Sequence, residues 1–235
     1  MSGTLSYFVI SKYYQIMIIM KTQEKNFDGI KLSGFTAILI MLALTGTAIY
    51  LLSLPQTPSI IAGVICGICV VVMLPGFMII QPNNSRVLTF FGRYAGTVIS
   101  NGFYWVNPLF LKSTVTLRIL NLNIDPIKVN DKVGNPIMIG AVVVWRIKDT
   151  YKASFDISGN IREFVQIQSD AALRQVAGMY AYDTNETIDK VTLRSDESGE
   201  ITQRLEDELN SRLAIAGIEI VEARINYLAY ASEIA

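Results

Sequence analysis

The sequence contains no histidine, the side chain that serves most often as a general base and as a metal ligand. It has two cysteines, Cys66 and Cys69, and both lie in one long apolar stretch. The rest of the chain therefore has no disulfide framework, and the cysteines do not indicate whether the protein lies in a reducing or an oxidising compartment. Neither a Gly-x-Ser-x-Gly elbow nor a glycine-rich phosphate-binding loop is present. These absences predict a protein that is not an enzyme, with no catalytic residues, no cofactor and no metal site.

Charge is absent from residues 35–80, which contain no Asp, Glu, Lys or Arg. This stretch holds two apolar runs of roughly 20 residues each, and a helix of that length covers the 30 Å hydrocarbon core of a bilayer. The linker between them, residues 55–59, has two prolines and no charge. A backbone in lipid must satisfy its own hydrogen bonds, so both runs are predicted to be helices. The sequence therefore predicts a transmembrane helical hairpin over residues 35–80, with both flanks on one side.

The second run contains Pro75 and Gly76, which we interpret as a bend where the chain leaves the membrane. A tolerated proline at a helix end is the alternative interpretation. If the helix stops before Pro75, the hairpin is short enough to be re-entrant. Two full crossings are the preferred prediction.

Orientation follows from the basic residues beside the hairpin, since cytoplasmic flanks carry the excess of Lys and Arg. Lys21, Lys25 and Lys31 precede it, Arg86 and Arg93 follow it, and the linker carries none. Residues 1–34 are therefore predicted to be a cytoplasmic segment, and the soluble part is placed on the cytoplasmic face. Residues 1–19 lack a basic region before their apolar part, and we expect them to be an upstream extension.

Small residues recur within the second run. Gly63 and Gly67 form a Gly-x-x-x-Gly pair, which is predicted to let a neighbouring helix approach closely, with residues 45–48 as the nearest candidate. The alternative is the general glycine richness of membrane helices. Cys66 and Cys69 form a literal Cys-x-x-Cys motif. Thioredoxin-type chemistry needs a thiolate at a helix N-terminus beside a βαβ unit, so packing of small residues is the better interpretation.

Residues 81–235 are long enough for a compact domain with a core. They hold 16 basic and 18 acidic side chains, which argues against a nucleic-acid partner, since such proteins carry a basic patch. Strand-like runs come first, at 86–91 and 137–147, and helical periodicity follows at 161–180 and 197–216. A closing strand is predicted at 218–225. Strands followed by helices predict the α+β class.

Between the first two predicted strands the pattern is less regular. Residues 92–96 are expected to form a tight turn, and residues 115–124 a single strand with a phase shift or bulge. A loop is expected around the aromatic residues Phe103, Tyr104 and Trp105. These three are a candidate interfacial anchor, because aromatic rings gather at membrane surfaces, and burial in the core is the alternative.

Five segments in this region resemble, in order, the SPFH domain of stomatin, prohibitin, flotillin and the bacterial protease regulators. They cover residues 76–235 and lie at 87–97, 102–110, 130–149, 172–174 and 216–235. Residues 81–235 are therefore expected to form an SPFH domain, in a chain that looks like a bacterial member. The two-run hairpin departs from relatives that carry one span or a short re-entrant segment.

The resemblance implies a generally non-enzymatic membrane scaffold that forms large homo-oligomers, organises a membrane patch and regulates a membrane protease, channel or transporter. Membrane lipids and further copies of the chain are the other implied partners. A coiled-coil region usually follows the point where this sequence stops, so we expect a longer protein. Two other functions stay open. They are a channel or transporter subunit, disfavoured because residues 35–80 carry no charge, and a membrane-anchored serine hydrolase using a Ser/Lys dyad.

Overall fold

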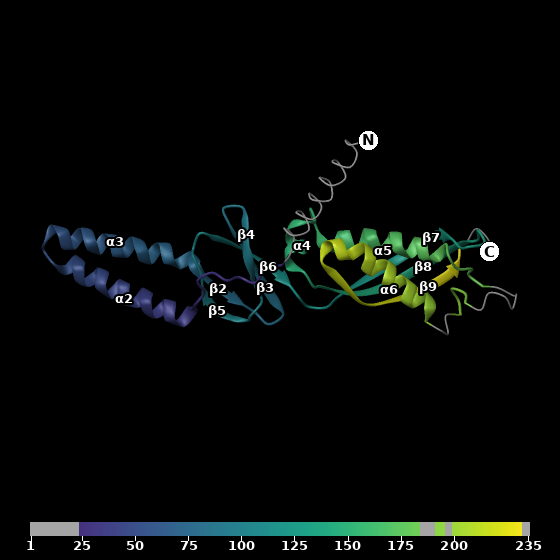
Figure 1. Cartoon of the computed structure of the whole chain (residues 1–235), viewed down its shortest axis with the longest axis horizontal. Coiled ribbons are helices and arrows are strands. Elements are labelled where there is room, and N and C mark those ends of the chain that lie inside the picture. The colour runs from purple at the N-terminus through teal and green to yellow at the C-terminus, as the bar shows by residue number, and fades with distance from the viewer. Residues whose placement is uncertain (1–23, 184–190, 196–198, 232–235) are drawn as a thin grey trace, which may run out of the picture. The chain divides into compact units, whose positions relative to one another are not determined.

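The computed structural model describes residues 24–183, 191–195 and 199–231 (Figure 1). The prediction made for residues 1–19 lies outside these ranges. The chain divides into two compact units between Thr116 and Leu117. This boundary falls inside the region expected to be one SPFH domain, so that region contributes to both units.

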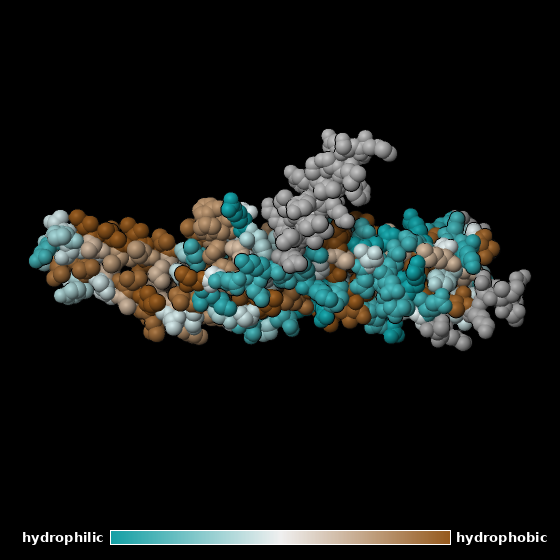
Figure 2. Space-filling view, in the orientation of Figure 1, coloured by the Kyte–Doolittle hydropathy of each residue, from teal (hydrophilic) through white to brown (hydrophobic). Residues whose placement is uncertain are grey.

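The first unit begins with the predicted hairpin. Helix α2 spans Gly34–Ser53 and helix α3 spans Thr57–Met73, and the two lie side by side (Figure 1). Both are covered mainly by apolar side chains (Figure 2). Two stretches of 20 residues, Gly34–Ser53 and Thr57–Gly76, are long and apolar enough to cross a membrane. Pro58 falls in the first turn of α3, where its missing N–H costs nothing.

The second helix ends earlier than predicted. A 3₁₀ turn, η1, spans Leu74–Gly76, and strand β2 follows over Phe77–Ile80. The expectation of a helix up to Ile80 was wrong, because Pro75 has no N–H for the helical hydrogen bond to Val71 and its ring crowds that carbonyl. The four apolar residues after η1 pair with a strand instead.

That pairing forms a small sheet in the order β1-β5-β2, in which β1 spans Leu32–Ser33 and β5 spans Gly102–Trp105. Strands β2 and β5 pair in antiparallel fashion, with Phe77 opposite Trp105 and Ile80 opposite Gly102. The predicted loop around the three aromatic residues is therefore a strand. Aromatic side chains favour strands, and the apolar β2 supplies the partner.

A second sheet of the same unit has the order β4-β3-β6, with β3 at Asn84–Phe90, β4 at Arg93–Val98 and β6 at Phe110–Thr116. The turn predicted at 92–96 was misplaced, since only Phe91 and Gly92 lie between β3 and β4. Both have positive φ, 44° and 80°, as a tight hairpin turn requires. A core cluster shared by both sheets contains the buried residues Met78, Ile80, Leu88, Val98 and Val106.

The segment before the hairpin joins this unit as well. The Phe27 N–H donates to the Thr97 carbonyl at 3.1 Å, and the Thr97 N–H donates to the Lys25 carbonyl at 2.8 Å. Strand β1, directly before α2, pairs with β5. Both flanks of the hairpin are thus hydrogen-bonded into one unit, and they must lie on the same side of any membrane that the hairpin enters.

The second unit is a sheet in the order β7-β8-β9 with two long helices. Strands β7, β8 and β9 span Leu120–Asn130, Pro136–Ile147 and Ile218–Tyr230. The helices are α4 at Thr150–Phe155, α5 at Ile161–Ala177 and α6 at Glu200–Leu213, followed by a 3₁₀ turn, η2, at Ala214–Ala216. Alternate residues of β8 from Ile137 to Ile147 are buried, and α5 and α6 pack on the sheet (Figure 1).

Two predictions for this part need correction. Residues 115–124 are not one bulged strand, because β6 ends at Thr116 and β7 begins at Leu120, in different units. Residues 137–147 are apolar at both alternating sets of positions, which predicts a strand buried on both faces, but strand β8 is fully buried on one face only and mostly half-buried on the other. The α+β class itself is confirmed, with two apolar helices followed by antiparallel sheets and helices.

Candidate functional site

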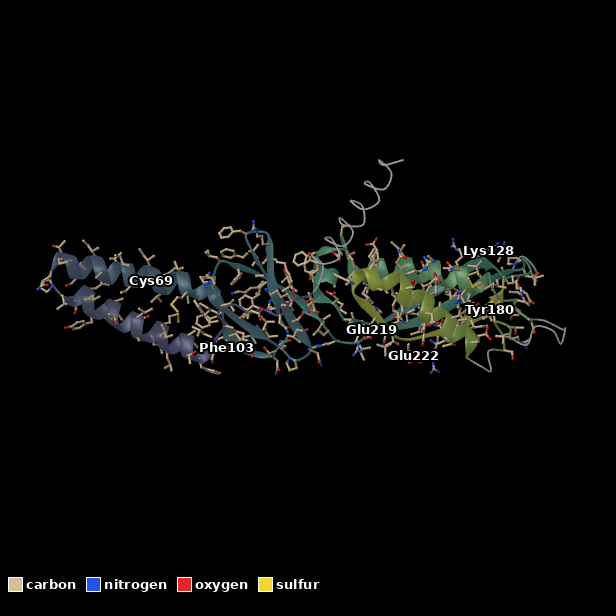
Figure 3. The ribbon with its side chains drawn as sticks, in the orientation of Figure 1. Cys69, Phe103, Lys128, Tyr180, Glu219 and Glu222 are labelled. Atoms are coloured by element: carbon tan, nitrogen blue, oxygen red, sulfur yellow. The ribbon has the colours of Figure 1, made fainter. Side chains whose placement is uncertain are left out.

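The base of the hairpin is the part of the molecule where the predicted site residues gather. We call it the exit collar, and it consists of β1, η1, β2 and β5. Phe103, on β5, lies there next to the helix ends (Figure 3). The collar fixes how the chain enters α2 and leaves α3.

Trp105 caps the C-terminal end of α3. Its indole Nε1–H donates to the Met73 carbonyl at 2.9 Å, and so satisfies one of the carbonyls that a helix leaves unpaired at its C-terminus. Gly76 makes this approach possible. A Cβ at that position would lie 2.3 Å from Trp105 Nε1 and 2.6 Å from the Val106 carbonyl oxygen. The Val106 N–H also donates to the Gly76 carbonyl at 3.0 Å, so the chain bends here in close contact with β5.

Phe103 links the two ends of the hairpin. Its ring stacks on Phe77 with centroids 5.6 Å apart and meets Phe35 edge-on at 5.5 Å. Gly34, the first residue of α2, lies against the same ring, since a Cβ there would be 2.2 Å from a ring carbon. The start of α2 and the start of β2 are therefore held by one aromatic side chain.

Tyr104 faces the other way and holds the basic residue that precedes α2. Its hydroxyl donates to the Asn101 carbonyl at 3.1 Å, and the Lys31 ammonium lies 4.7 Å from its ring centroid. Lys31 also donates to Ser100 Oγ at 3.2 Å. All three collar aromatics are half-buried. Each ring is partly exposed and partly packed against the protein, and the interfacial role of these residues stays a prediction.

Two further cations point at the outer edge of β2; the sequence indicated Arg86 only as a basic residue beside the hairpin and did not single out Lys112. The Lys112 ammonium, from β6, donates to the carbonyls of Pro75 and Phe77. Arg86 Nη2, from β3, donates to the Ile79 carbonyl at 3.4 Å. Burial lowers the pKa of Lys112 from its ordinary value, and the positive charge of Arg86 lowers it further.

The glycine pair of α3 divides between two environments. Gly63 is buried against α2, and a Cβ there would lie 2.8 Å from Leu52 Cγ and 3.2 Å from the Ala48 carbonyl oxygen. Gly67 has nothing within 4 Å of its would-be Cβ. The close approach inside the hairpin therefore uses Gly63 alone. Both cysteines are free thiols, and Cys69 is exposed on α3 (Figure 3).

In the second unit the Asp131 carboxylate, in the turn between β7 and β8, is bound by several N–H donors. It accepts the backbone N–H groups of Val133 at 3.0 Å, Asn135 at 2.7 Å and Tyr182 at 3.0 Å, and the Asn135 side-chain amide at 3.2 Å. Burial alone would raise the pKa of Asp131, but these donors outweigh it and hold the pKa below its ordinary value. The side chain ties the β7–β8 turn to the segment after α5.

Among the residues that the structure describes, no cluster of three or more His, Cys, Asp or Glu side chains could hold a metal ion. The polar groups of the collar are engaged mainly with backbone carbonyls at the hairpin base. The chemistry that the collar supports is therefore positioning and binding.

Comparison with known protein families gives a match over most of the chain. No curated protein is significantly similar to the sequence. Residues 78–235 match the SPFH domain / Band 7 family, over a stretch that begins in β2 and continues through both units. This stretch is well over half of the chain, and with the two apolar helices it indicates membrane association. The chain belongs to the SPFH domain / Band 7 family.

Proposed function

We propose that the protein is a protomer of a membrane-anchored scaffold. Its hairpin enters the bilayer from the cytoplasmic face, its SPFH region stays on that face, and many copies assemble to organise a membrane patch and regulate a membrane protease, channel or transporter. The observation that carries the proposal is the attachment of both hairpin flanks to one unit, with an unburied apolar hairpin projecting from it.

The exposure of α2 and α3 supports membrane insertion. Only 11% of each candidate span is buried inside the protein, whereas the core helix of a soluble protein is mostly buried. Large apolar side chains are exposed along both helices, among them Leu39, Leu42, Ile49, Ile61, Ile65, Ile68 and Val72. An apolar surface of this extent in water is strongly unfavourable, and lipid removes the penalty.

Cysteine labelling tests the topology. In a chain with Cys66 and Cys69 replaced by alanine, Gln56→Cys places a thiol in the turn between the helices, and Ser113→Cys places one on exposed β6. If the hairpin crosses the bilayer, an impermeant reagent added to sealed inside-out vesicles should label position 113 but leave position 56 unlabelled. Reagent added to right-side-out vesicles should give the reverse.

Two results would contradict parts of this arrangement. Protection of position 56 from both sides would show a shallow, re-entrant hairpin. Labelling of position 113 from outside right-side-out vesicles would place the SPFH region on the opposite face. Detergent-permeabilised vesicles, in which both thiols should react, provide the control for reagent access.

Particle size tests the scaffold itself. The resemblance to scaffold proteins implies assembly, so the protein in mild detergent is expected to migrate as a particle many times the 26.1 kDa mass of this chain. Size-exclusion chromatography with light scattering measures this directly. A small monomer that shows ion flux or catalytic turnover would favour the channel or hydrolase alternatives.

A further inference from the structure

Arg86 and Lys112 lie on one face of the β3–β6 pair, directly beside the point where α3 ends. Arg86 is opposite Thr114, and Lys112 is opposite Leu88, so the two cations occupy diagonal positions of the antiparallel pair. Their donors reach the carbonyls of Pro75 in η1 and of Phe77 and Ile79 along the outer edge of β2. The two positive charges thus meet at one edge of the exit collar.

Among the described residues, no carboxylate pairs with either of these charges. Residues 29–124 contain no Asp or Glu, and among the described residues neither Arg86 nor Lys112 forms an ion pair. One of the two acidic residues before this stretch, Asp28, lies near Lys25 at 3.9 Å. The repulsion between Arg86 and Lys112, which contributes to the lowered pKa of Lys112, is therefore uncompensated within the described part of this unit.

The two cations keep unused hydrogen-bonding capacity. An ammonium has three donors and a guanidinium five. Lys112 spends two on the carbonyls of Pro75 and Phe77, and Arg86 spends one on Ile79. An incoming anion with several acceptor oxygens could bind both side chains without displacing these contacts.

A hollow of about 360 Å³ opens at this place, lined by Phe77, Met78, Ile79, Arg86, Phe103 and Lys112. A second hollow of about 300 Å³ shares Ile79 and Arg86 with it. The walls of the first hollow are apolar apart from the two cations, and the Ile79 side chain is 64% exposed. The site therefore combines a cationic pair with an apolar surface immediately after the second membrane helix.

We propose that Arg86 and Lys112 bind the phosphate of an anionic membrane lipid where α3 leaves the bilayer. A guanidinium fork matches phosphate oxygens in two parallel hydrogen bonds, and the adjoining apolar wall suits the upper part of an acyl chain. Residues 24–116 carry five basic and two acidic side chains, which favours an anionic bilayer surface. The inference rests on insertion of the hairpin but not on oligomer size or a protein partner.

Native mass spectrometry of the full chain in mild detergent tests the site. The protein is titrated with dioleoyl phosphatidylglycerol, dioleoyl phosphatidylcholine or inorganic phosphate. The anionic lipid should be retained in preference to phosphatidylcholine, and Arg86→Gln should weaken its retention roughly tenfold, the loss expected when a charged donor no longer hydrogen-bonds the phosphate. Arg86→Lys keeps the charge but loses the fork, and an intermediate loss is expected.

Arg93→Gln is the matched control, because it removes the same charge from the same unit at an exposed position on β4, outside the two hollows. It should leave lipid retention unchanged. Equal losses from Arg86→Gln and Arg93→Gln would overturn the proposal in favour of diffuse surface attraction. Binding of inorganic phosphate without preference for the anionic lipid would overturn the lipid assignment.

Membrane fractionation of the same proteins separates this inference from the proposed function. A wild-type chain that fractionates with membranes but shows no preference for phosphatidylglycerol would overturn the site alone. A wild-type chain absent from the membrane fraction would overturn both.

Discussion

Replacing Gly76 with alanine is expected to lower the free energy of unfolding of the first unit by about 3 kcal/mol. The added Cβ would lie 2.3 Å from Trp105 Nε1 and 2.6 Å from the Val106 carbonyl oxygen. The second of these atoms belongs to the backbone directly after β5 and cannot move away alone. Relief of the clash must therefore separate η1 from β5 and break the hydrogen bonds from Trp105 to Met73 and from Val106 to Gly76.

Denaturant titration of the protein in mild detergent measures the loss, and amide exchange of the peptides covering β2 and β5 locates it. Gly67→Ala is the matched control, because it adds the same methyl group to α3 where nothing lies within 4 Å. Alanine is the better helix former, so this variant should be as stable as the wild type or slightly more stable. Equal losses in the two variants would show that close contact at Gly76 does not hold the exit collar.

The hairpin was predictable because its signal is simple. Two uncharged runs of helical length, joined by a proline-containing linker, identify membrane helices by length and composition alone. The end of the second helix was not predictable to the residue. Residues 77–80 are as apolar as the helix before them, and composition does not distinguish a short buried strand from the last turn of a membrane helix. Pro75 marked the interruption, but only the pairing of β2 with β5 shows that the chain continues as a strand.

The candidate site depends on contacts that local patterns do not contain. Trp105 was noticed as an aromatic residue, but its bond to Met73 joins positions 32 residues apart. Arg86 and Lys112 become neighbours only through the register of β3 with β6. The two-unit division was missed for a related reason, since residues 117–119 look like the continuation of a strand until the partners of β6 and β7 are known.

The turn between β7 and β8, in the second unit, also depends on a contact between residues far apart in the sequence. Residues 130–136 are rich in Asn, Asp, Gly and Pro, a composition typical of a turn, and Gly134 has a positive φ of 100°. The importance of Asp131 was not visible, because its bond to Tyr182 spans 51 residues. Four N–H donors converge on this one buried carboxylate, so its removal leaves several donors without an acceptor.

Asp131→Ala is therefore expected to destabilise the second unit by about 3 to 4 kcal/mol at pH 7, since hydrogen bonds to a charged group contribute roughly 1.5–3 kcal/mol each and are not additive. Fluorescence-detected urea unfolding in a Trp105→Phe background measures this, because buried Trp145 then reports on the second unit alone. Asp125→Ala removes an exposed carboxylate from the strand before this turn, β7, and should change stability by less than about 0.5 kcal/mol.

The pH dependence of the same comparison isolates the charge of Asp131. Its pKa is lower in the folded than in the unfolded chain, so its contribution is fully present above the ordinary Asp value of about 4 and is lost as the pH falls through the folded-state pKa. The stability difference between wild type and Asp131→Asn should therefore be constant from pH 7 to about pH 5 and shrink below about pH 4. A difference that stays constant down to pH 3 would show that the N–H donors do not stabilise the carboxylate form, and that the turn is held by packing instead.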